Sequence, residues 1–400
     1  MIRLPPTAFV IVMFLGQLSA MGGFSTIPTI LPDIQAAWQL TNTEAGFLNG
    51  VFFFGLAATT PILTGLTDRI DPKLIYLWSM VLSGVAQLGF AFASDGLISG
   101  SAWRTLHGIG YAGTYMPGLR AISDAVPDHM QSRAVAIFTS TAPSGTGVSF
   151  FLSGLVATTF DWRMTVAIVA AGTIVALAVG ALFLTSAPPR AEKSKSLLPD
   201  VRPAFANRNS LGHIVAYFGH QLETSTTRSF AVVFLLFAIE IAPPGGVEWA
   251  PTVVVGIATI LCLPAILAAD HLSTRFGRHR LILLIMICGA ICGVGLGASL
   301  GASYTLIALL MILYGISAGA DGGLINAGLI ASTSPQQRGG VMAAHSAIGF
   351  TGAVVGPVVF GAALDLGGGN TEASAWLAGF GVIAVIIVGC AAISRKLVRR

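Results

Sequence analysis

Runs of about twenty apolar residues alternate with short polar segments along the whole chain of 400 residues. Each run is long enough to cross a hydrocarbon core of ~30 Å as a helix. Helices are expected because lipid offers no hydrogen-bond partners to the backbone. The pattern predicts twelve spans, at residues 7–31, 44–66, 74–94, 97–119, 134–157, 163–187, 211–240, 247–269, 280–301, 303–330, 339–365 and 372–394. The predicted fold class is therefore an all-α membrane protein.

The composition supports a membrane protein and excludes several other classes. Only 10% of the residues are charged and 54% are hydrophobic, whereas roughly a quarter of a soluble domain is charged. No group of His, Cys or Asp has the spacing of a metal site or a catalytic site, so neither an enzyme nor a cofactor is expected. All four cysteines lie within apolar runs, which favours packing over a disulfide; they are Cys262, Cys288, Cys292 and Cys390.

The basic residues predict how the chain is oriented. All but three of the 21 Lys and Arg residues fall in alternate loops and at the two ends, and the exceptions are Arg104, Arg163 and Arg228. Lys and Arg concentrate on the cytoplasmic side of membrane proteins. Both termini are therefore expected in the cytoplasm of a bacterium, with the chain passing many times through its inner membrane. The net charge of +4 is explained by the bilayer, and no nucleic-acid partner is expected.

The chain is predicted to consist of two halves. Residues 1–187 form one six-helix bundle, residues 188–210 a polar cytoplasmic linker, and residues 211–400 a second six-helix bundle. Similar residues recur at a nearly constant offset of 205 to 207 positions; the matched pairs are Leu66 and Leu272, Arg69 and Arg275, Gly108 and Gly315, and Arg133 and Arg338. A duplicated six-helix unit explains this repeat.

The loop after the second span carries a family resemblance. Residues 64–73 read Thr-Gly-Leu-Thr-Asp-Arg-Ile-Asp-Pro-Lys, and the matching loop near 270–279 keeps Arg275, Gly277 and Arg278. These two loops resemble the corresponding loops of the major facilitator superfamily, and the resemblance extends over the whole chain. The resemblance implies a monomeric transporter, and it implies a gating role for these loops. The gating candidates are Asp68, Arg69, Lys73, Arg275 and Arg278. Thr64, Asp71 and Thr274 depart from the family pattern.

Two further segments are similar to patterns of the same family. Residues 104–110 resemble its pattern in the fourth span, with His107 in place of the usual Gln. The antiporter signature of the fifth span is absent there, and a related Gly-rich segment lies at 352–361 instead. This difference weakens an interpretation as a drug exporter without excluding it.

Ionisable residues within the spans are few, and they are expensive there unless they face a partner or a water-filled cavity. They are Arg104, His107, His213, His220, Glu223, Arg228, Asp321 and His345. The resemblance implies that spans 1, 4, 7 and 10 line the central cavity. All of these ionisable residues except His345 lie on one of those spans. His345 is interpreted as a core histidine with its hydrogen bonds satisfied. The polar segment 221–228 also predicts a local break in the seventh helix.

The predicted function is secondary active transport by alternating access, with protons as the coupling ion and a small polar or anionic organic solute as cargo. Substrate binding is assigned to Arg104, His107, His220 and Arg228, because arginine keeps its charge and suits anions. Proton coupling is assigned to Glu223 and Asp321, because burial favours the neutral carboxyl group until water can enter. Arg104 and Glu223 could instead only neutralise neighbouring charges. Efflux of drugs or metabolites and a non-transporting sensor or scaffold are the alternatives.

Overall fold

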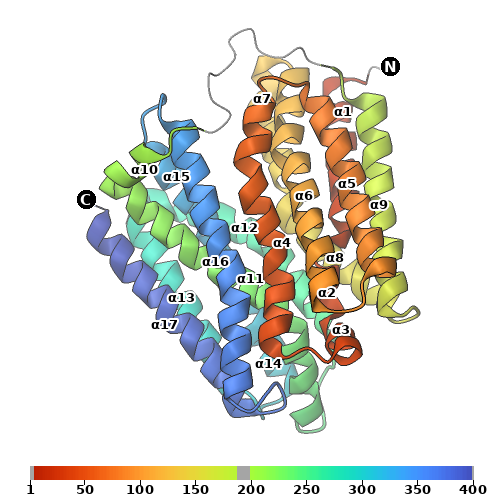
Figure 1. Ribbon diagram of the computed structural model, residues 1–400. Coiled ribbons are helices and arrows are strands. Elements are labelled where there is room, and N and C mark those ends of the chain that lie inside the picture. Colours follow the sequence, from red (N-terminus) through yellow and green to blue (C-terminus); the bar gives the residue numbers. More distant parts are fainter. Residues whose placement is uncertain (1–3, 187–198, 399–400) are drawn as a thin grey trace. The chain divides into compact units, whose positions relative to one another are not determined.

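The computed structural model describes residues 4–186 and 199–398, so residues 188–198 of the predicted linker lie outside the described part. The helices are α1 (Pro6–Ala20), the 3-10 helix η1 (Met21–Gly23), α2 (Thr26–Thr29), α3 (Leu31–Trp38), α4 (Asn42–Leu66), α5 (Pro72–Ala93), α6 (Leu97–Ala125), α7 (Asp128–Thr139), α8 (Thr141–Ala157), α9 (Trp162–Phe183), α10 (Arg202–Ala206), α11 (Arg208–Ile241), α12 (Pro251–Phe276), α13 (Arg278–Ala298), α14 (Tyr304–Ala320), α15 (Gly322–Ala331), α16 (Arg338–Leu366) and α17 (Ala373–Leu397). Every regular element among the described residues is helical (Figure 1). The predicted all-α class is confirmed.

The spans follow the predicted ones closely. Eleven helical stretches among the described residues are long and apolar enough to cross a membrane. The expected fourth span is also a helix, α6. It is the least apolar of the twelve because it carries Arg104, His107 and Arg120. Large apolar side chains point outward from many of these helices, for example Trp78, Ile98, Leu155 and Val385, each about 70% exposed or more. Such exposed apolar groups are expected where lipid surrounds the helices.

Polar residues at the loop ends start several of these helices. Asp71 caps α5 by accepting a hydrogen bond from the Lys73 backbone N–H, and Pro72 occupies the first turn. Asp161 caps α9 in the same way, and Asn207 accepts two backbone hydrogen bonds at the start of α11. Asp and Asn are favoured at this position because their side chains satisfy otherwise unpaired N–H groups.

The helices form two compact units. Unit 1 consists of Met1–Ile30 and Val51–Pro199, and unit 2 consists of Leu31–Gly50 and Asp200–Arg400. In unit 1, α5 packs against α6 and α9. In unit 2, α11 packs mainly against α16 and α17 and also contacts α12, α14 and α15, so its side chains face several other helices.

The beginning of α4 belongs to unit 2 and is held there by Asp365 of α16. One carboxylate oxygen accepts hydrogen bonds from the backbone N–H and the side-chain amide of Asn42, both at 2.9 Å. The other oxygen accepts from the Thr43 N–H at 2.8 Å and its hydroxyl at 2.5 Å. The helices are close because glycines line the crossing: a Cβ added at Gly46 would lie 2.1 Å from the Pro357 carbonyl oxygen. A side chain on α16 thus satisfies N–H groups in the first turn of α4, a helix far away in the sequence.

Three spans predicted as continuous helices are broken in the structure, and one span predicted to be broken is continuous. The first span divides into α1, η1 and α2, and the fifth divides into α7 and α8 at Ser140. The tenth span divides into α14 and α15 at Asp321. The seventh span, where a break was predicted, is the unbroken α11 of 34 residues.

The prediction for α11 was wrong because most hydroxyl groups of the polar segment find their partners within the helix; among the described residues of this segment, only Ser225 donates outside it, to the Ala353 carbonyl oxygen of α16 at 2.8 Å. Thr224, Thr226, Thr227 and Ser229 each donate to the carbonyl oxygen four residues earlier, at 2.7 to 2.9 Å. These bonds satisfy the hydroxyl groups within the helix. A polar sequence can therefore remain helical in an apolar environment.

Candidate functional site

The break between α14 and α15 places a buried carboxyl group in the middle of unit 2. Asp321 is only 2% exposed and stands between the last residue of α14 and the first of α15. Gly322 follows it, and a Cβ added there would lie 2.8 Å from Nε2 of His220. Glycine is needed at this position because the imidazole occupies the space of a side chain. Interrupted helices with freed polar groups are typical of binding sites in transporters.

His220 of α11 is the direct partner of Asp321. Its Nδ1 lies 2.6 Å from the nearer carboxylate oxygen. The two side chains are 11% and 3% exposed, so the pair is largely shielded from water. A short, buried contact between an imidazole and a carboxyl group lets a proton move from one group to the other when their surroundings change.

Glu223 lies one turn further along α11 and is also buried, at 2% exposure. Its Oε1 has no hydrogen-bond partner among the described residues. The same oxygen would lie 2.6 Å from a Cβ added at Gly289 of α13. Asp321 and the Tyr314 hydroxyl are close enough to interact with this carboxyl group. Two acids and a histidine therefore converge here, and their roles in substrate binding and proton coupling stay predictions.

Arg228 lies on another side of α11. It follows Glu223 by five positions, which places it about 140° around a regular helix. It is half-buried, and its charge acts on Cys262 of α12. The structure therefore groups His220, Glu223 and Asp321 tightly and places Arg228 toward α12.

Arg104 and His107, the other two predicted binding residues, belong to unit 1. Arg104 is 4% exposed, its guanidinium lies 4.9 Å from the centre of the Phe52 ring, and Nη1 is 3.5 Å from Nδ1 of His107. Its Nε has no hydrogen-bond partner in the described part of the chain. A small cavity beside it has about 10 Å³ of space for water centres and is lined by Thr26 and Gln87 among others, which suffices for one water molecule.

The predicted gating loops differ between the two units. In unit 1, Asp68 forms an ion pair with Arg120 at 2.8 Å, and Lys73 donates to the carbonyl oxygens of Ala181 and Leu184 at the end of α9. Arg69 is exposed.

In unit 2, Arg275 is exposed and Arg278 is half-buried. Between them, Gly277 adopts a positive φ of 83°. Helix-end bonds and one ion pair therefore organise the loop of unit 1, whereas a glycine turn organises that of unit 2. The gating role of both loops stays a prediction.

The Asp68–Arg120 pair can be measured by a double-mutant cycle. We expect Asp68→Asn and Arg120→Gln each to lower the melting temperature, with a coupling free energy of about 1 kcal/mol, because the pair is only half-shielded. The measurement is thermal unfolding of the purified protein in detergent. Additive single effects would show that the two side chains stabilise the protein independently.

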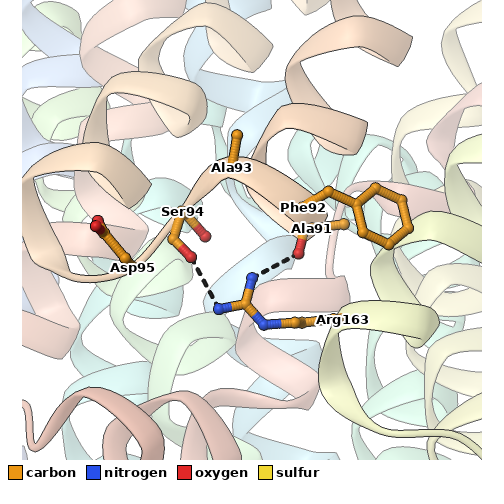
Figure 2. Close-up of a pocket in the computed structure, with 6 residues that line it drawn as sticks. All are labelled: Ala91, Phe92, Ala93, Ser94, Asp95 and Arg163. Atoms are coloured by element: carbon orange, nitrogen blue, oxygen red, sulfur yellow. Dashed lines mark hydrogen bonds between the residues drawn. The ribbon is translucent and has the colours of Figure 1, made fainter.

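Arg163, one of the three exceptions to the pattern of basic residues, has a structural role. Its guanidinium donates to the carbonyl oxygens of Ala91 at 2.7 Å and Ser94 at 2.9 Å, and it covers the Trp162 ring at 4.3 Å. Figure 2 shows these bonds closing the end of α5 within an open surface pocket. Arginine at a helix C-terminus satisfies the last carbonyl groups, so this pocket is explained by helix capping.

Sequence reasoning missed a second group of polar aromatic residues in unit 2. The Tyr217 ring stacks on His345 with 3.9 Å between centroids, and His345 Nε2 is bonded to Oδ1 of Asn326 at 2.8 Å. Nδ1 of His345 has no partner among the described residues, so the interpretation of a fully satisfied core histidine was wrong for one of its two nitrogens. The available signal was Tyr217 itself, which follows His213 by four residues on one helix face.

Comparison with known proteins agrees with this architecture. The sequence model of the Major Facilitator Superfamily matches residues 13–242, more than half of the chain. The niacin transporter NiaP of Acinetobacter baylyi is 26% identical over 138 residues, which are 34% of this chain and 31% of the relative. Protein spinster homolog 3 of Mus musculus is 25% identical over 240 residues, 58% of this chain and 45% of the relative. These matches span less than half the length of either relative.

A solved structure is similar over almost the whole length. It is a bacterial homologue of the human lysosomal transporter Spinster in an inward-facing, unoccupied conformation. The TM-score is 0.78 at 16% identity, covering 98% of this chain and 97% of the other. At this identity the likeness shows a shared fold.

Proposed function

Because the chain belongs to the major facilitator superfamily and is thus a secondary transporter rather than an enzyme, we propose that it carries a small organic anion by alternating access, coupled to protons. The observation that carries this proposal is the buried His220–Asp321 pair at a helix break, with Glu223 beside it. A buried acid next to an imidazole can exchange its proton when a path to water opens. The coupling role of Glu223 and Asp321 follows from this chemistry.

The anionic character of the cargo rests on two arginines. Arg104 in unit 1 is buried and has no ion pair among the described residues, and Arg228 lies half-buried on α11. A buried cation is costly unless an anion approaches it. The niacin relative is named for a solute with a carboxylate group, which supports a carboxylate as the cargo class. Substrate binding by Arg104, His107, His220 and Arg228 is part of this proposal.

The distribution of basic residues supports the proposed location. We place the chain in the bacterial inner membrane, with both termini and the basic ends of α11 and α13 on the cytoplasmic side. The proposed working form is the monomer.

A thermal-shift screen tests the cargo class. We expect nicotinate to raise the melting temperature more than nicotinamide, which differs only in having a neutral amide in place of the carboxylate, and more strongly at pH 6 than at pH 8. A ligand at a hundred times its Kd stabilises the folded state by about 2.7 kcal/mol. Small carboxylates, inorganic oxyanions, sugars and lipophilic cations complete the panel. Stabilisation by lipophilic cations alone would contradict the anion proposal and favour drug efflux.

The Arg228→Ala variant tests whether Arg228 recognises the negative charge of the solute. We expect it to weaken nicotinate binding by at least about tenfold, since a charge-assisted hydrogen bond is worth about 1.5–3 kcal/mol. Arg280→Ala, at an exposed position, is the matched control. Equal loss of nicotinate and nicotinamide binding in the Arg228 variant would show a packing role instead.

A further inference from the structure

Unit 2 contains buried imidazole nitrogens that neither the His220–Asp321 pair nor the packing explains. Nδ1 of His213, Nδ1 of His345 and both ring nitrogens of His279 have no hydrogen-bond partner among the described residues. His213 is 5% exposed and His345 1%. An unsatisfied buried polar group costs about 1–3 kcal/mol, and ordered water normally fills this need in folded proteins. These nitrogens therefore indicate where water enters the unit.

The positions form a column along one helix. His213, Tyr217, His220 and Glu223 follow one another on α11 at spacings of four, three and three residues, which keeps them on one face. At 1.5 Å per residue the column is about 15 Å long. That length is half of a ~30 Å hydrocarbon core.

Side chains of α15 and α16 lie beside this column. The Tyr217 ring is nearly parallel to His345 of α16 and to His220, with centroid distances of 3.9 and 5.8 Å. Because Oδ1 of Asn326 can only accept, His345 donates to it from Nε2. The unpartnered Nδ1 of the neutral ring is then an acceptor. Tyr217 is a positioning residue that holds the two imidazoles.

The far end of the column reaches the basic end of α13. His213 meets His279 edge to face at 5.8 Å, and His279 is the second residue of α13, next to Arg278. Glycines of α15 leave room for the rings: a Cβ added at Gly328 would lie 2.4 Å from Cε1 of His213. The imidazoles therefore occupy space that the glycines of α15 leave open.

We propose that His345, His213 and His279, together with bound water, form a proton path from the His220–Asp321 pair to the basic end of unit 2. The unpartnered nitrogen of each imidazole accepts a proton from a protonated water, and the resulting cation gives a proton from that same nitrogen to the next water. Each transfer therefore breaks one O–H or N–H bond as it forms another, and Nε2 of His345 keeps its proton in the bond to Asn326. The inference rests on the proposed proton coupling and adds the route by which Asp321 exchanges its proton.

The charged and titratable groups around the path are few. His213 interacts electrostatically with His279 and Arg278 of α13. His345 interacts electrostatically with His213 and His220 of α11. Asp321 faces His220 and Glu223. On α17, which packs on α11 and α13, Cys390 lies beside Gly219, and Arg395 and Lys396 stand in the last turn.

Hydroxyl-radical footprinting with mass spectrometry tests for the water directly and needs no solute. Radicals produced from bound water label adjacent side chains even where bulk solvent is excluded. We expect labelling of His345, which is 1% exposed, well above that of Trp376, a more reactive side chain that is fully buried among aromatic rings. Labelling of His345 no higher than that of Trp376 would overturn the proposal.

The double variant His213→Gln, His345→Gln tests the function of the path. In vesicles, accumulation of nicotinate driven by a pH gradient should fall at least about tenfold, in keeping with the contribution of positioned proton-transfer groups. Exchange of labelled for unlabelled nicotinate should persist, which also shows that the variant is folded. His271→Gln, at an exposed position of α12, is the matched control.

The outcomes separate this inference from the proposed function. If Asp321→Asn abolishes accumulation and the double histidine variant does not, the path is wrong and proton coupling at Asp321 stands. If neither change affects accumulation, the proposed coupling itself fails. If nicotinate is not carried, the footprinting result alone decides whether the hydrated path exists.

Discussion

Replacing Asp321 with asparagine is expected to reduce accumulation of nicotinate driven by a pH gradient at least about a hundredfold, within the range of positioned acid–base groups. Asparagine has nearly the same shape but cannot bind or release a proton. The 2.6 Å contact with His220 would then join two neutral groups. Exchange of labelled nicotinate across the membrane moves no net protons, so it should continue.

The measurement is uptake into vesicles with and without a pH gradient, compared with counterflow. Glu223→Gln is expected to behave in the same way, because Glu223 is the second buried acid of the cluster. Glu240→Gln is the control, since Glu240 is exposed near the end of α11. Proton-driven accumulation that survives both changes would remove these carboxyl groups from coupling.

Replacing Asp365 with alanine is expected to destabilise the folded protein by about 1–2 kcal/mol, the range for losing a helix N-terminal cap, because the Asp365 side chain is itself exposed. Its carboxylate accepts four hydrogen bonds from Asn42 and Thr43 at the start of α4. Bonds to a charged acceptor are individually strong but not additive, and water can replace part of them at an exposed carboxylate. An alanine would leave the N–H groups of that first turn without their partner.

Thermal unfolding in detergent measures this loss. Asp365→Asn keeps one acceptor oxygen and should give a smaller decrease. Glu372→Ala, close in sequence and exposed, is the control and should leave the melting temperature unchanged. An Asp365→Ala variant as stable as the unchanged protein would show that water replaces the carboxylate at the α4 terminus.

The arrangement of the site shows where sequence reasoning reached its limit. His213, His220 and Glu223 could be placed on one helix face because helical periodicity is local. Their partners on other helices could not be assigned, since Asp321 lies 101 residues from His220 and His345 and Asn326 are on different helices. The predicted break in α11 failed because hydroxyl groups found partners within the same helix, whereas the real break formed at Asp321, where an imidazole occupies the space beside Gly322.

The sequence by itself determined the membrane environment, the helical class, the approximate spans and the repeat. These properties depend on apolar runs of fixed length and on the need to satisfy the backbone within each segment. Only the tertiary structure decided which polar groups meet: His220 with Asp321, Tyr217 with His345, and Asp365 with the start of α4. Such contacts depend on how closely helices approach, and glycines such as Gly46, Gly322 and Gly328 control that distance only once their neighbours are in place.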